Sequence, residues 1–313
     1  MTASQEPKTW PVARAQRALL VFNPQAGDAA ASPEELLEIL SLMQFWNFQP
    51  EVHIVTTETE TAAVVRAALR RGVRLVVAAG GDGTIESTAQ ALVDTDAVLG
   101  VLPKGTRNNL ALSLGIPQDL GAAVELLRRG RILRMDVGRA VCGGSSAWFL
   151  ETSSIGLLPA IYPAADDIQH GNLARITELL STLVTYQPAS LRLTLDGGAP
   201  VDMQGYLVLI ANAPYFGANI QVSPFVSFQD GWLDVFLFPF LSKLDLLGIA
   251  ATQIAVGGAE DSRIVHYRVK RAQIEADPAM HVTADGTSLG VGPLTAEIHP
   301  SGLRVITGLG EQP

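Results

Sequence analysis

LVVAAGGDGTIE, residues 75–86, is the stretch that decides the fold. Its first half, Leu75–Ala79, is a short apolar run of the kind found in strands buried on both faces. Three glycines and one carboxylate follow within Gly80–Thr84, and a run compatible with a helix begins at Thr84. Glycine lets the backbone approach a bulky anion, and a helix N-terminus presents unpaired N–H groups to that anion. Residues 75–86 therefore predict a strand, an anion-binding loop and a helix.

Asp82 is unexpected in this loop, because it carries a negative charge. A carboxylate inside an anion-binding loop would repel a bare phosphate. It makes sense beside a metal ion, beside a ligand hydroxyl, or as the acceptor of a proton. The alternative is structural, a tight turn from strand to helix in which Asp82 caps the helix.

The first 136 residues alternate between strands and helices around residues 75–86. The predicted strands are 18–22, 52–55, 74–79, 97–102 and 131–137. The predicted helices are one beginning at Ser32-Pro33, then 61–71, 84–92 and 119–129. This alternation is typical of a doubly wound, mostly parallel sheet, whose ligands bind beyond the carboxyl ends of the strands. Three polar or glycine-rich loops follow strands here, namely 23–27, 80–84 and 103–109, and we expect them to face one crevice.

Beyond about Asp136 the pattern changes to short alternating runs separated by turn residues. The predicted strands are 148–152, 190–195, 205–210, 233–238, 263–270, 280–284, 294–298 and 303–306, with helical insertions at 173–186 and 243–256. Such spacing is typical of an antiparallel sandwich. We therefore predict an α/β plus β protein with a flexible arm at 1–17, a nucleotide-binding α/β domain at 18–136 and a β-rich domain at 137–313.

Composition limits the classes of function. The 313 residues carry a net charge of −9, which argues against a nucleic-acid partner. Cys142 is the only cysteine, which excludes a disulfide framework. The five histidines are scattered along the sequence, which together with the single thiol argues against a zinc cluster. The N-terminal 17 residues lack the apolar core of a signal peptide, and the longest apolar stretch, 235–258, is interrupted by Pro239, Lys243 and Asp245. We expect a cytoplasmic protein without a membrane span.

Five stretches together resemble the diacylglycerol-kinase-type lipid kinases, in particular the bacterial branch that is also similar to sphingosine kinases. They are Asn23-Pro24-Gln25-Ala26-Gly27, Gly80–Glu86, Pro103–Ala111 with Leu114–Pro117, Asp230-Gly231-Trp232-Leu233-Asp234, and Asp285-Gly286-Thr287. The Gly-Gly-Asp-Gly-Thr loop alone is shared with NAD kinases, whereas the loop at 103–111 and the segment at 230–234 are more specific to the lipid kinases. The resemblance covers about residues 18–308.

The resemblance implies an ATP- and Mg²⁺-dependent kinase that phosphorylates the hydroxyl of a diacylglycerol-like lipid alcohol during transient contact with a membrane. Asp82 and Asp285 would be the catalytic carboxylates, with Asp285 supplied from the second domain. The implied nucleotide-binding residues are Asn23, Gly80, Gly81, Gly83, Thr84, Glu86, Gly105, Thr106 and Asn109. Asp230 and Asp234 would hold a structural Mg²⁺ or form a turn network that braces the second domain.

Thr287 departs from the resemblance, because the family has a glutamate at this place and threonine offers only a neutral hydroxyl. A lost proton acceptor typically costs about 10²–10⁴-fold in rate. An alternative is therefore a weakened or inactive kinase that binds lipid or nucleotide, and a third, disfavoured alternative is an NAD kinase. Asp285-Gly286 is also a common two-residue hairpin turn. Neither the lipid acceptor nor homodimerisation follows from the sequence.

Overall fold

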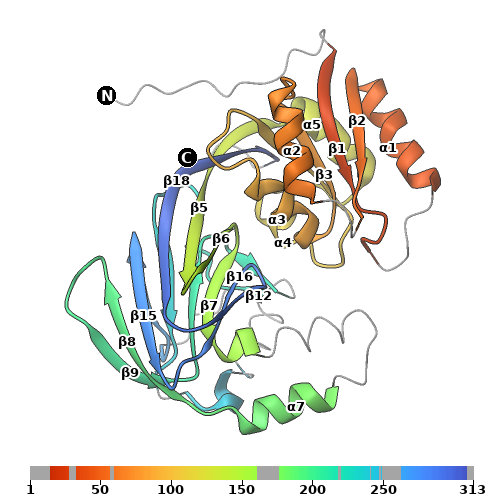
Figure 1. Cartoon of the computed structure of the whole chain (residues 1–313). Helices are drawn as coiled ribbons and strands as arrows, with labels where there is room; N and C mark the ends of the chain where they lie inside the picture. Colours follow the sequence, from red (N-terminus) through yellow and green to blue (C-terminus); the bar gives the residue numbers. More distant parts are fainter. Residues whose placement is uncertain are drawn as a thin grey trace. The chain divides into compact units, whose positions relative to one another are not determined.

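The computed structural model describes residues 15–27, 33–56, 60–160, 176–217, 220–239, 241–246, 248 and 262–308. The chain divides into two compact units, the first formed by residues 1–135 with 301–313 and the second by residues 136–300. Two long strands, β5 (Arg131–Cys142) and β18 (Leu294–Thr307), contribute residues to both units. Figure 1 shows the elements with the labels used below.

The first unit is built on a parallel sheet in the order β2-β1-β3-β4, continued by the last part of β18. Its further strands are β1 (Gln16–Phe22), β2 (Phe48–Ile54), β3 (Leu75–Gly80) and β4 (Val98–Pro103). Its helices are α1 (Pro33–Phe45), α2 (Thr61–Arg70), α3 (Asp82–Gln90), α4 (Asn109–Ser113) and α5 (Leu120–Arg129). The predicted doubly wound sheet is confirmed.

Helices cover both faces of this sheet, which explains why its central strands are apolar throughout. Helix α1 packs beside α5, and α2 packs beside α3 (Figure 1). Every residue of β3 is buried, as a strand enclosed on both faces requires. Asp119 caps α5 by accepting a hydrogen bond from the backbone N–H of Ala122 at 2.8 Å. Connections of this type place the loops that follow the strands along one edge of the sheet.

The second unit is an antiparallel sandwich. One sheet contains the first part of β18 with β15 (Arg271–Asp277), β8 (Ala189–Leu195) and β9 (Val201–Gly205), and β5 pairs with both β18 and β6 (Ser145–Phe149). The other has the order β14-β13-β10-β7-β16-β17. Its strands are β7 (Thr152–Gly156), β10 (Leu207–Ala211), β13 (Leu233–Leu237), β14 (Val265–Val269), β16 (His281–Ala284) and β17 (Thr287–Val291).

One apolar core joins the two sheets of this unit. It contains inward-facing residues of β8 and β15, such as Leu191 and Ile274, together with Val208 and Val235 from β10 and β13. The alternation of buried and exposed residues along β8 and β15 is the period-2 pattern of a strand with one wet face. Outside the two sheets lie the short hairpin β11 (Tyr215–Phe216) and β12 (Ile220–Gln221) and the helix α7 (Ile176–Thr185). The predicted antiparallel sandwich is confirmed.

Several predicted boundaries need correction. The strand predicted at 148–152 is broken at Leu150 and Glu151, which separate β6 from β7. The two strands predicted at 294–298 and 303–306 form the single strand β18, because the turn-like residues between them continue the strand with Ser301 at φ 56°. Strands β9, β11, β12, β15 and β17 and helix α4 were not predicted. Of the helix predicted at 243–256, residues 243–246 are helical, and residues 249–256 lie outside the described part of the chain.

At the end of the chain, the compact units differ from the predicted domain boundary. Residues 301–308, predicted to lie in the second domain, group with the first unit. Arg304 and Val305 of β18 pair in parallel with Val98 and Leu99 of β4. A run of short strands in sequence cannot reveal that the last one pairs with a strand about 200 residues earlier.

Candidate phosphate-binding edge and carboxylate sites

The carboxyl ends of three parallel strands in the first unit lie side by side. Phe22, the last residue of β1, is in register with Ala79 of β3, and Gly80, the last residue of β3, is in register with Pro103 of β4. The loops at 23–27, 80–84 and 103–109 therefore leave the sheet from neighbouring points. We call these three loops together the loop edge. Their predicted convergence is present within this unit.

Backbone contacts hold the loop edge together, and glycine permits the closest of them. A Cβ atom on Gly105 would lie 2.6 Å from the Cα of Gly81, and a Cβ atom on Gly27 would lie 2.8 Å from the carbonyl oxygen of Lys104. The N–H of Lys104 also donates to the Gly80 carbonyl at 3.0 Å. Since any side chain at these glycines would force the loops apart, the glycine positions follow from loop packing as well as from ligand approach.

Asn23 and Thr84 join the first loop to the second. The Asn23 amide donates from Nδ2 to Oγ1 of Thr84 at 2.9 Å, and its Oδ1 accepts from the N–H of Gln25 at 3.0 Å. Both polar ends of the Asn23 side chain are thus engaged in shaping the loop. The groups best placed to meet phosphate are therefore the amides of the helix N-terminus and of the glycine loops.

Helix α3 starts two residues earlier than predicted, and this places Asp82 in its first turn. Gly81 is the N-cap residue and makes no side-chain cap bond, and its carbonyl accepts from the N–H groups of Thr84 and Ile85. The N–H groups of Asp82 and Gly83 precede the first residue that can bond within the helix. They lie at the positive end of the helix dipole, where an anion is stabilised.

The carboxylate of Asp82 is partly desolvated. Burial raises the pKa of Asp82 above its ordinary value, while the charge of Arg107 and the backbone N–H groups of Asn109 and Asn108 act in the opposite direction. The Asn109 N–H donates to Oδ1 of Asp82 at 3.1 Å. Glu86 lies one helical turn further on the same face of α3, is buried, and accepts from Nε2 of Gln90 at 3.0 Å. Asp82 is therefore a stronger base than an exposed aspartate, and it lies at the loop edge.

Asn108 shapes the third loop and was not among the predicted site residues. It has φ 53° and ψ 44°, and its side chain accepts from the Gly105 N–H at 2.8 Å and donates to the Gly105 carbonyl at 2.6 Å. These two bonds close residues 105–108 into a compact turn that contains Thr106 and Arg107. Asparagine tolerates the left-handed conformation better than most residues, and that preference is the signal by which sequence could have identified it.

Asp285 occupies a setting in the second unit that differs from its predicted catalytic role. Its carboxylate accepts hydrogen bonds from three consecutive backbone N–H groups, those of Leu150, Glu151 and Thr152, with the last two at 2.9 and 2.8 Å. Asp285 (φ 43°) and Gly286 (φ 83°) form the two-residue turn between β16 and β17. These three bonds let Asp285 hold the β6–β7 connection, and its catalytic role stays a prediction.

Thr287 begins β17, pairs with Ala284 of β16, and is exposed. Buried polar side chains surround the same hairpin. Ser153 donates from Oγ to the Thr283 carbonyl at 2.8 Å, and the hydroxyls of Ser154 and Thr283 are 3.1 Å apart. The buried amide of Asn212 donates to the carbonyls of Asp136 and Leu150. This polar cluster gives the Asp285 region a structural network that the sequence motifs did not indicate.

Asp230 and Asp234 form ion pairs, which favours the bracing network over a Mg²⁺ site. Arg268 pairs with Asp230, and His266 Nε2 lies 2.6 Å from Oδ1 of the buried Asp234. Burial raises the pKa of Asp234, against the opposing effect of the His266 contact. Within the described part of the chain, no three His, Cys, Asp or Glu side chains are grouped as a metal site would require.

The basic run at 263–271 is largely neutralised. Arg263 pairs with Asp245 at 2.8 Å, Arg268 with Asp230, and Arg271 with Glu297 at 2.5 Å. Most of the positive charges in this segment therefore have a carboxylate partner on a solvent-facing surface. The segment offers little net positive charge for binding an anionic lipid.

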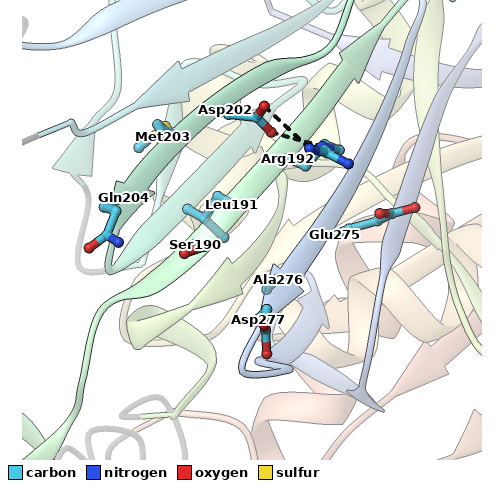
Figure 2. Close-up of a pocket in the computed structure, with 9 residues that line it drawn as sticks. All are labelled: Ser190, Leu191, Arg192, Asp202, Met203, Gln204, Glu275, Ala276 and Asp277. Carbon is cyan, nitrogen blue, oxygen red and sulfur yellow. Dashed lines mark hydrogen bonds and ion pairs between the residues drawn. The ribbon is translucent and has the colours of Figure 1, made fainter.

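A pocket of about 610 Å³ lies over β8, β9 and β15 in the second unit (Figure 2). Arg192 and Asp202 form an ion pair across its lining, and Glu275 and Asp277 add two further carboxylates. The lining mixes these charged side chains with the apolar Leu191, Met203 and Ala276, and no predicted site residue lines the pocket. Among the described residues, no helix is long and apolar enough to cross a bilayer.

Comparisons with known proteins match the two parts of the chain to two domain families. Residues 17–140 match the family described as "Diacylglycerol kinase catalytic domain", and residues 159–307 match "YegS C-terminal NAD kinase beta sandwich-like domain". The chain is 28% identical over 249 residues to a Mycobacterium tuberculosis protein named diacylglycerol kinase, covering 78% of this chain and 80% of that one. It is 26% identical over 291 residues to a Pseudomonas aeruginosa "Probable lipid kinase YegS-like", covering 92% of each.

Solved structures share the fold. A Bacillus anthracis structure described as a diacylglycerol kinase superposes with a TM-score of 0.71 at 23% identity, covering 95% of this chain and 98% of that one. This likeness supports the arrangement of a parallel-sheet unit followed by an antiparallel sandwich.

Proposed function

Since the chain belongs to the diacylglycerol kinase catalytic-domain family, we propose that it is an ATP- and Mg²⁺-dependent lipid kinase that phosphorylates the hydroxyl of a diacylglycerol-like lipid alcohol. The observation that carries the proposal is the loop edge. Three loops with closely packed glycines meet there, and the desolvated carboxylate of Asp82 lies at the N-terminus of α3.

The loop edge has the groups that phosphoryl transfer needs. Backbone N–H groups at the start of α3 would bind phosphate oxygens, since the chain has no Gly-x₄-Gly-Lys-Ser/Thr loop for that purpose. Glycine backbone at Gly81 and Gly105 would admit the phosphates closely. Asp82 would orient the acceptor hydroxyl and accept its proton, which its raised pKa favours.

The residues present fit a Mg²⁺ ion that is held mainly by the phosphates of the substrate. Mg²⁺ is usually bound through one or two carboxylates together with phosphate oxygens and water, so it needs no cage of protein ligands. Asp82 is the one carboxylate within the three loops and would be the protein ligand. When bound, Mg²⁺ would screen the negative charge of the triphosphate.

The direct test incubates the purified protein with Mg-ATP and vesicles that contain a panel of lipid alcohols, diacylglycerol among them. We expect a phosphorylated lipid that is separated by thin-layer chromatography and that requires both ATP and Mg²⁺. Failure to phosphorylate any lipid alcohol would reject the proposal. Because the acceptor lies in a bilayer, the protein would reach it through transient contact with the membrane surface.

Two alternatives give different outcomes in the same experiments. Thr287 motivates a weakened family member that binds lipid or nucleotide without efficient phosphotransfer. Robust turnover that is abolished by Asp82→Asn would exclude it. An NAD kinase would form NADP from NAD and ATP under the same conditions, and we expect no NADP.

A further inference from the structure

The loop edge has few positive charges for a ligand as anionic as a triphosphate. By sequence, the segments that follow the carboxyl ends of β1, β2 and β3, residues 23–32, 55–60 and 80–84, contain no lysine, arginine or histidine. The loop after β4 contains two, Lys104 and Arg107. Any cationic side chain that these loops offer to the phosphates must therefore be one of these two residues.

Lys104 already has a partner. Its ammonium forms an ion pair with Glu35 in the first turn of α1, and its side chain is only 7% exposed. The ammonium also lies 5.1 Å from the centre of the Phe22 ring. Withdrawing a buried cation from its carboxylate would leave that carboxylate unpaired at considerable cost. Lys104 thus links the third loop to α1.

Arg107 is placed differently. It lies in the compact turn of residues 105–108 that the Asn108 side chain closes, and this turn packs through Gly105 against Gly81 at the start of α3. Two residues later, the Asn109 N–H binds the Asp82 carboxylate. Arg107 is half-buried and acts electrostatically on Asp82. Its turn is thus fixed by short contacts beside the carboxylate and beside the N–H groups of α3.

We propose that Arg107 is a further catalytic residue, whose guanidinium contacts the γ-phosphoryl group while that group is transferred. This inference rests on the proposed kinase function. A planar guanidinium can bind two phosphate oxygens at once and stays protonated throughout. In the step, the bond from the γ-phosphorus to the β-bridging oxygen breaks, and a bond to the acceptor oxygen forms. The hydroxyl proton passes to Asp82, and ADP leaves.

The charge of Arg107 stabilises the negative charge on the transferring group, as arginine does in other phosphoryl-transfer sites. A residue that only supported the fold would not make the protein distinguish ATP from ADP.

The kinetic test compares Arg107→Ala, Arg107→Lys and the control Arg129→Gln. Arg129 is exposed near the C-terminus of α5, where it contacts Glu125 and the Trp46 ring just before β2, at the opposite end of the strands from the loop edge. Its loss removes one positive charge without touching the loops. We expect Arg107→Ala to lower kcat by about 100-fold or more, Arg107→Lys to lie between, and Arg129→Gln to match wild type.

If wild type phosphorylates a lipid, the proposed function holds, and a kcat for Arg107→Ala within threefold of wild type overturns the inference about Arg107. A binding arm covers the case in which wild type phosphorylates no lipid. There, calorimetric titration with Mg-ATP and Mg-ADP should show that wild type prefers ATP and that Arg107→Ala loses this preference. An equal preference in the two proteins, or no nucleotide binding by wild type, overturns the inference.

Discussion

The tripeptide Asp-Gly-Thr occurs twice, at residues 82–84 in the first unit and at 285–287 in the second, and the two aspartates are in different physical states. Asp82 begins a helix, is half-buried, and has a raised pKa. Asp285 occupies a left-handed turn, and three backbone N–H groups bind its carboxylate. The same tripeptide thus contains a desolvated carboxylate in the first unit and a carboxylate that accepts backbone hydrogen bonds in the second.

The comparison shows two environments in which a protein can hold a carboxylate. A carboxylate that accepts several hydrogen bonds stabilises the fold, and protonating it costs free energy. A carboxylate that is mainly affected by burial reduces stability, but it accepts a proton more readily and can take part in catalysis. We therefore expect substitutions at Asp82 to affect activity above all, and substitutions at Asp285 to affect stability above all.

The largest effect should come from Asp82→Asn. The amide can still accept the bond from the Asn109 N–H, but it cannot accept a proton, so we expect kcat for lipid phosphorylation to fall by about 10²–10⁴-fold. The free energy of unfolding in urea at pH 7 should be unchanged or higher, because a buried charge is removed. A kcat within tenfold of wild type would contradict the role of Asp82.

Asp285→Ala should mainly destabilise the protein. It leaves the N–H groups of residues 150–152 without their acceptor, and we expect the free energy of unfolding to fall by about 2–4 kcal/mol. Asp196→Ala is the matched control, since Asp196 is an exposed turn residue that accepts bonds from the N–H groups of Lys270 and Arg271.

The control should lose less than about 1 kcal/mol, because water can replace its carboxylate. If Asp285→Ala kept wild-type stability and lost phosphotransfer, the assignment of Asp285 to a structural role would be wrong.

The pH dependence of stability tests whether Asp82 is desolvated. The pKa of Asp82 is raised on folding, so the folded state holds this proton more tightly than the unfolded state. The resulting cost to stability is absent below the unfolded pKa, grows as the pH rises through the folded pKa, and is constant above it. The free-energy difference between Asp82→Asn and wild type should therefore be largest at neutral pH and vanish in acid. A difference that is independent of pH would show that Asp82 is not desolvated.

Thr287→Glu should have the smallest effect. It adds a carboxylate at the exposed start of β17, beside the turn that contains Asp285. We expect lipid phosphorylation to change by less than about tenfold, since Asp82 already supplies the proton acceptor. An increase beyond about 100-fold would instead identify wild type as a weakened kinase that lacks its second carboxylate.

The fold was largely predictable, because its main signals are local. The apolar run before Gly80 predicted a strand buried on both faces, and all of β3 is buried. The pairing of Arg304 and Val305 with β4 was not predictable, since a parallel strand added from the end of the chain leaves no local pattern. The break between β6 and β7 was missed for a similar reason, because it follows from the amides that turn toward Asp285.

For the candidate site, the sequence determined where the glycines, Asp82 and the polar loops fall, and hence that strands would end in an anion-binding edge. Only the tertiary structure decided what each carboxylate can do. Asp82, Asp285 and Asp234 look alike as letters, yet one is desolvated, one is bound by three amides, and one faces a histidine. Protonation free energy depends on burial and on partners distant in the chain, so no local pattern can specify it.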